Sequence, residues 1–182
     1  MDRLREPRNA AIVGLLIAAV VVVLFLVLKN NDDDGNSEPA ATNGAEGVSV
    51  AQLQTVASSV DHPVYWAGER PGKRYELTVT DQGNIFVRYL DPNTPVGSRS
   101  VASLTIGTYP VPDAYAATKS VADRPGSKTG KTPDGGYVVT NSNNPNSVYI
   151  AYPDSDHQIE VYDPNPKTAF SLAESGAVVP IS

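Results

Sequence analysis

The segment from Asp61 to Gly68 holds the side chains best suited to chemistry or binding. It reads Asp-His-Pro-Val-Tyr-Trp-Ala-Gly and contains the only tryptophan and one of the two histidines of the chain. Aromatic rings with a polar edge are favoured in binding patches, so His62, Tyr65 and Trp66 are candidate binding residues. We favour a structural interpretation, in which Tyr65 and Trp66 close one end of the core between a helix and the first strand.

The second histidine belongs to a polar cluster at a predicted turn. Asp154, Asp156 and His157 come directly before a predicted strand, and such a set could bind a metal ion or support a Ser–His pair. Aspartate is equally expected in a turn, where its carboxylate bonds to nearby backbone. We favour the turn, and the sequence predicts no metal site.

The segment from Gly126 to Thr132 has some features of a phosphate-binding loop. It has three residues between its glycines where the motif needs four, and Pro133 follows in place of a helix. We therefore expect a flexible loop over 124–136. The chain has no cysteine, which excludes disulfides, thiolate metal sites and a cysteine nucleophile. No cofactor is predicted, and a non-catalytic domain is favoured over an enzyme.

An apolar run near the N-terminus determines where these residues would act. Residues 10–28 form an unbroken apolar stretch of 19 residues, which as a helix would span about 28 Å, close to the hydrocarbon thickness of a bilayer. Three arginines precede the run and three aspartates soon follow it. The positive-inside rule therefore places residues 1–9 in the cytoplasm. A cleaved signal peptide is the alternative, but its apolar region is shorter and ends at a small-residue cleavage site.

The next segment, residues 29–47, is predicted to be a disordered acidic linker. It carries five acidic residues and no aromatic residue, so it cannot bury enough apolar surface to fold. Residues 48–182 then form the extracytoplasmic domain. The net charge is −6 and no basic patch stands out, which argues against a nucleic-acid partner.

The pattern of residues 48–182 predicts an α+β fold with a mainly antiparallel sheet and helices on one face. A capping box at Ser49 and Gln52 begins the first helix. The expected helices cover about 50–60, 114–123 and 167–174, the last ending at Gly176. The expected strands cover about 74–80, 84–90, 102–109, 137–141, 147–152 and 157–162, with a last strand over 177–181.

The order of these elements suggests a duplicated αβββ unit. Val87-Arg-Tyr-Leu-Asp-Pro92 echoes Ile150-Ala-Tyr-Pro-Asp-Ser155, and Ile106-Gly-Thr-Tyr109 echoes Ile159-Glu-Val-Tyr162. We expect two βββ units related by an approximate twofold axis.

The first hairpin has a preferred register. A three-residue loop ending in a left-handed Gly83 pairs Thr80 with Asn84 and keeps the apolar residues on one face. The same register sets Glu76 opposite Arg88, a cross-strand pair worth under about 1 kcal/mol.

Four motifs between residues 60 and 110 carry a resemblance to a known set of proteins. They are His62-Pro-Val-Tyr-Trp-Ala-Gly68, Tyr75-Glu-Leu-Thr78, Val87-Arg-Tyr-Leu90 and Leu104-Thr-Ile-Gly-Thr-Tyr109. Their combination resembles uncharacterised actinobacterial envelope proteins that have an N-terminal membrane anchor. The resemblance implies a membrane location and no catalytic residue.

Taken together, these features predict a single-pass protein of the cell membrane with its C-terminal domain outside. The anchor over 10–28 contacts the lipid bilayer, and the domain binds another envelope protein or a cell-wall component. The alternative is a cell-envelope hydrolase with an unrecognised site. An exposed cluster of His62, Tyr65 and Trp66 in a cleft beside a carboxylate would favour the enzyme, whereas a buried Trp66 would remove it from the candidate site.

Overall fold

A computed structural model describes residues 44–182 of the chain. The predicted cytoplasmic residues 1–9, the predicted membrane helix over 10–28 and most of the predicted linker over 29–47 lie outside the described residues. Across 44–182, no helix is both long and apolar enough to span a membrane.

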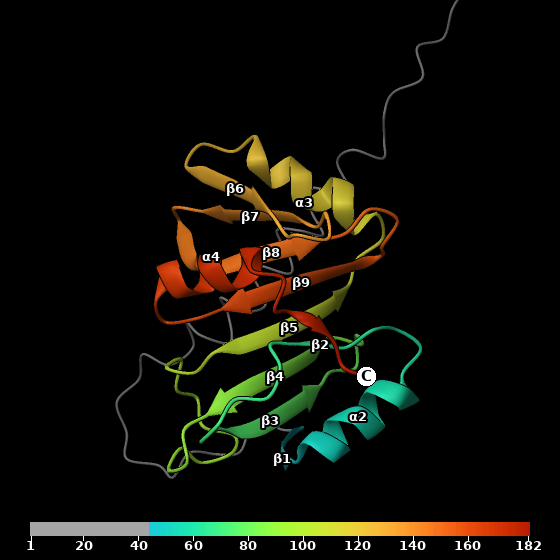
Figure 1. Ribbon diagram of the computed structural model, residues 1–182, viewed down its shortest axis with the longest axis vertical. Helices are drawn as coiled ribbons and strands as arrows, with labels where there is room; N and C mark the ends of the chain where they lie inside the picture. Colours follow the sequence, from blue (N-terminus) through green and yellow to red (C-terminus); the bar gives the residue numbers. More distant parts are fainter. Residues whose placement is uncertain (1–43) are drawn as a thin grey trace, which may run out of the picture. The chain divides into compact units, whose positions relative to one another are not determined.

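An eight-stranded antiparallel sheet forms the framework of the described domain (Figure 1). Its spatial order is β1-β3-β4-β5-β9-β8-β7-β6, so four strands lie on each side of the central β5–β9 contact. The strands are β1 (Ala45–Val48), β3 (Arg74–Val79), β4 (Ile85–Leu90), β5 (Thr105–Pro110), β6 (Ser127–Lys131), β7 (Tyr137–Asn141), β8 (Asn144–Ala151) and β9 (His157–Tyr162). A separate two-stranded sheet pairs β2 (Tyr65–Trp66) with β10 (Val179–Pro180). The α+β class and the antiparallel sheet are thus confirmed.

Helices lie on both faces of the sheet, which corrects the expectation that they share one face. Helix α2 (Val50–Ser59) contributes Leu53 to the main core, and α4 (Pro166–Glu174) contributes Phe170. Helix α3 (Ala114–Ala122) covers the opposite face of the sheet. This placement is shown by its Thr118 hydroxyl, which accepts a hydrogen bond from the Gln158 side chain at 2.7 Å. Gln158 alternates along β9 with Ile159, which belongs to the main core.

The predicted start of α2 and end of α4 are confirmed. Ser49 caps α2 and accepts from the Gln52 amide at 3.3 Å, while the Gln52 side chain accepts from the Ser49 amide at 2.8 Å. Gly176 follows α4 with a positive φ of 74°, the left-handed conformation that commonly terminates a helix.

The β3–β4 hairpin has the predicted register. The Thr80 amide donates to the Asn84 carbonyl at 3.0 Å, and Gly83 is left-handed with φ 78°. The face that carries Tyr75, Leu77, Ile85, Val87 and Tyr89 is buried, whereas Val79 at the end of β3 remains 46% exposed.

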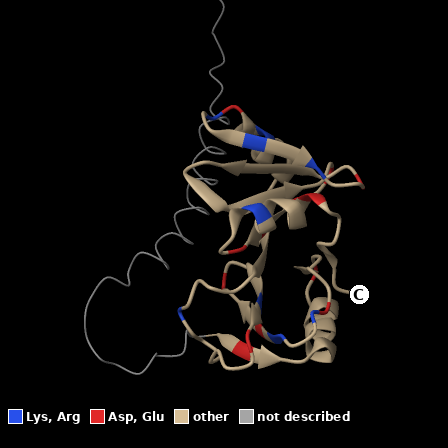
Figure 2. Ribbon diagram, turned by 60° about the vertical axis from the view of Figure 1, so that its left-hand side comes forward, with Lys and Arg blue, Asp and Glu red and all other residues tan. Residues whose placement is uncertain are grey.

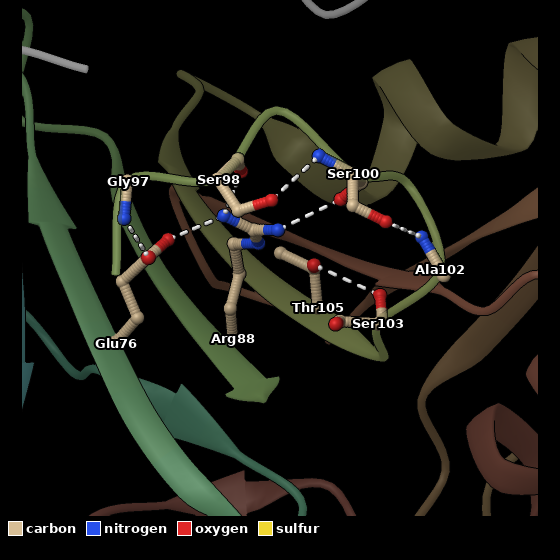
Figure 3. Close-up of polar contacts among 8 residues, drawn as sticks. All are labelled: Glu76, Arg88, Gly97, Ser98, Ser100, Ala102, Ser103 and Thr105. Carbon is tan, nitrogen blue, oxygen red and sulfur yellow. Dashed lines mark hydrogen bonds and ion pairs between the residues drawn. The ribbon is translucent and has the colours of Figure 1, made fainter. Parts of the chain in front are cut away.

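A buried ion pair fastens the long connection between β4 and β5 to the sheet (Figure 3). Glu76 is 1% exposed, and its Oε1 lies 2.5 Å from Nη1 of Arg88. Arg88 also donates to the carbonyls of Ser98 and Ser100 at 2.9 and 2.8 Å, and the Gly97 amide donates to Oε2 of Glu76 at 2.6 Å. The pair was expected at an ordinary cross-strand position, but this connection covers it, so that Glu76 is buried and Arg88 is half-buried.

Two predicted irregular segments contain the edge strands of the sheet. The loop expected over 124–136 includes β6, and the linker expected over 29–47 ends in β1, which pairs with β3. Figure 2 shows basic residues along β6, the outermost strand of its half. Edge strands often carry lysine because it discourages pairing with other chains, and this polar composition hid the strand. The last strand is shorter than expected over 177–181 and belongs to the small sheet.

Candidate functional site

His62 lies just after the C-terminal end of α2 and is half-buried. Its Nδ1 lies 3.2 Å from the carbonyl oxygen of Pro63. A carbonyl can only accept, so Nδ1 must carry the hydrogen of this contact. In the neutral ring the lone pair then resides on Nε2, which stays available to another partner.

His157 begins β9, and its ring meets that of His62. The two ring centroids are 5.2 Å apart and the ring planes are inclined by 30°. The sequence placed these histidines in two separate candidate clusters. The fold joins them because β9 crosses the sheet beside β5, which brings its first residue to the end of the sheet where α2 terminates.

Both histidines line one open pocket of about 640 Å³. Asp61 lies in the same wall, and the exposed side chain of Val79 adds apolar surface. The full lining is Ser59, Val60, Asp61, His62, Val79, Gly83, Ile85, Pro110 and His157. We call this site the histidine pocket.

The charge state of His157 is set mainly by burial. Desolvation lowers the pKa of His157 below its usual 6.5, and the neighbouring His62 lowers it further. The carboxylates of Asp156 and Asp61 act in the opposite direction. The balance favours a neutral imidazole at pH 7.

Neither Tyr65 nor Trp66 lines the histidine pocket. Tyr65 is 8% exposed, and its ring stacks with Tyr152 at a centroid distance of 6.4 Å. Trp66 is half-buried and meets Tyr75 edge-on at 6.2 Å. The described structure therefore does not gather the three candidate residues into one cleft, and a binding role for Tyr65 and Trp66 stays a prediction. The buried Tyr65 matches the structural interpretation, whereas Trp66 packs only partly against the core.

The aspartates near His157 have structural roles in the turn before β9. Oδ1 of Asp156 accepts from the Asp113 amide at 2.8 Å, which ties the turn before β9 to the start of α3. Asp113 and Asp154 both adopt the left-handed conformation, with φ of 52° and 59°, which aspartate tolerates better than most residues. Among residues 44–182, no three His, Asp or Glu side chains assemble into a metal-ligand set.

A buried carboxyl group at the centre of the sheet was missed by the sequence analysis. Glu160 of β9 is 3% exposed and accepts from the Tyr109 hydroxyl at 2.5 Å. Burial raises the pKa of Glu160, against smaller opposing effects of Ser147 and Tyr109. The signal available in the sequence was a single glutamate inside the apolar strand Ile159-Glu-Val161.

Comparison of the chain with protein-family models, with curated proteins and with solved structures finds no match. The resemblance to actinobacterial envelope proteins therefore stays a prediction.

Proposed function

We propose that residues 44–182 form a ligand-binding domain of the cell envelope and that the histidine pocket is its binding site. The observation that carries the proposal is the meeting of the only two histidines of the chain at one open pocket. Both histidines are only half-buried, and apolar side chains fill the core itself.

The walls of the pocket have the mixed character of a binding site. Val79 lines the pocket and is 46% exposed, while His62 and His157 offer polar ring atoms and Asp61 a carboxylate. Small-ligand sites typically combine apolar walls with a few polar groups that fix orientation. We infer a partner of the same character, an envelope protein or a cell-wall component.

Site-specific photo-crosslinking in living cells tests this proposal. A photoreactive amino acid replaces Val79 in the pocket or, as a matched control, Val179, an exposed valine of β10 outside the pocket lining. We expect a discrete adduct from position 79 that is lost when His62 is replaced by Gln. Equal adducts at both positions, or none at position 79, would argue against the pocket as the binding site.

We also propose that residues 10–28 anchor the protein in the cell membrane, with residues 1–9 in the cytoplasm. The apolar length of the run and the arginines before it support this topology. Protease added to intact spheroplasts should digest a tag placed after Ser182. A tag that is protected from the protease would contradict the proposed topology.

We infer further that the domain arose by duplication of an αβββ unit. The three inner strands of each half support this, because they run outward in the same chain order, β5-β4-β3 and β9-β8-β7. The helices break this symmetry, since α2 and α3 cover opposite faces of the sheet. The echoed residues also occupy matching positions: Val87 pairs with Ile106, and Ile150 pairs with Ile159. A superposition of residues 75–123 on 137–174 in an experimental structure tests the relationship.

A further inference from the structure

We propose that His62 and His157 form a binding site for a first-row divalent cation such as Zn²⁺. The inference rests on the binding function proposed above, since it assigns a ligand class to the same pocket. The two imidazoles supply two protein ligands. Water or a donor atom of the bound partner completes the coordination.

The spacing of the rings fits this assignment. At a Zn–N distance of about 2.0–2.1 Å, the ion lies about 3.2 Å from each ring centroid, and a tetrahedral angle then separates the centroids by about 5 Å. The centroids of His62 and His157 are 5.2 Å apart. The separation of the two rings is therefore that of two imidazoles that share one ion.

The hydrogen bond of His62 also suits a metal ligand. Histidine ligands usually donate their second ring N–H to a backbone carbonyl or a carboxylate, which fixes the ring and its tautomer. Nδ1 of His62 donates to the Pro63 carbonyl at 3.2 Å, which leaves Nε2 as the coordinating atom.

The surroundings favour an ion with an open coordination sphere. Asp61 lines the same pocket and contributes negative potential. The described residues supply no set of three ligands, so the site differs from a closed structural zinc centre, which uses four protein ligands. An imidazole pair prefers Zn²⁺, Cu²⁺ or Ni²⁺ over Mg²⁺ and Ca²⁺, which take oxygen ligands.

Titration of the full-length chain in detergent with ZnCl₂ tests the inference by calorimetry. We expect one site per chain whose affinity falls at least tenfold in His62→Gln and in His157→Gln. Asp154→Asn is the matched control: it changes a charge near His157 but lies outside the pocket lining, and it should bind Zn²⁺ like the unmodified chain. Mg²⁺ in excess should not compete.

Cobalt(II) supplies a second measurement that does not depend on the variants. Co²⁺ at a tetrahedral site gives intense visible absorption bands, and these should appear on the unmodified chain and disappear on addition of Zn²⁺. Unchanged Zn²⁺ affinity in both histidine variants, or octahedral Co²⁺ bands alone, would overturn the inference.

The two proposals fail separately in these experiments. A crosslink from position 79 that persists in EDTA, combined with no Zn²⁺ binding, would remove the metal site and leave the binding function. Zn²⁺ binding without any adduct at position 79 would support the metal site and argue against a partner in the pocket.

Discussion

Replacing Arg88 by Met should destabilise the domain far more than loss of an ordinary surface ion pair. The substitution leaves the Glu76 carboxylate 1% exposed without its cation, and removal of one partner of a buried pair costs about 3–5 kcal/mol. It also removes the hydrogen bonds to the Ser98 and Ser100 carbonyls. For a domain of this size, about 3–5 °C of melting temperature is lost per kcal/mol, so we expect a fall of roughly 10–20 °C.

A double-mutant cycle in urea unfolding isolates the interaction. Glu76→Leu combined with Arg88→Met removes both charges, and its free energy of unfolding should lie closer to that of the unmodified protein than that of Arg88→Met alone. The effect should change little between low and high salt, because buried pairs are screened much less than exposed ones. If Arg88→Met lowers the free energy of unfolding by less than about 1 kcal/mol, the Glu76–Arg88 pair contributes no more than an exposed ion pair, and the reasoning above is wrong.

Three further substitutions test the core and the histidine pocket. Trp66→Ala should lower the free energy of unfolding by about 2 kcal/mol, below the cost for a fully buried tryptophan, and a thermal shift under about 3 °C would instead favour an exposed binding role. Burial raises the pKa of Glu160 above its usual 4.5, so the native state binds this proton more tightly than the unfolded state, and the free energy of unfolding falls as pH rises above 4.5. Glu160→Gln should remove this decline, measured by urea unfolding at several pH values. An unchanged pH profile in the variant would contradict the prediction. The lowered pKa of His157 means that stability is lost as pH falls below about 6.5. In metal-free protein, His62→Gln should raise the pKa of His157 measured by NMR, and an unchanged value would show that the rings do not interact.

The strands that were predicted well carry strong local signals. Alternating apolar residues and Gly83 determine the β3–β4 hairpin, because a one-residue slip would turn Arg88 toward the apolar face. The edge strands β1 and β6 were missed because their sequences are polar and their stability comes from pairing with β3 and β7. Propensity alone does not record such pairing.

The meeting of the histidines could not be predicted from the sequence. His62 follows a helix and His157 begins a strand, and each looked like a local feature of a loop or a turn. Their contact depends on the crossing of β9 beside β5, a pairing between residues far apart in the chain. The sequence could identify the residues, but only the strand order places them together.

The central β5–β9 ladder has a consequence for how the domain folds. Each half of the sheet contains strands joined by hairpins, whereas β5 and β9 are the pair that unites the halves, from Thr105 with Tyr162 to Pro110 with His157. Long-range pairs of this kind form slowly, because a large loop must close first. His157 lies at one end of the ladder, so its approach to His62 should report the closing of the two halves. The NMR signals of the two imidazoles during refolding would therefore distinguish the assembled sheet, in which the rings are in contact, from a state that contains only local hairpins.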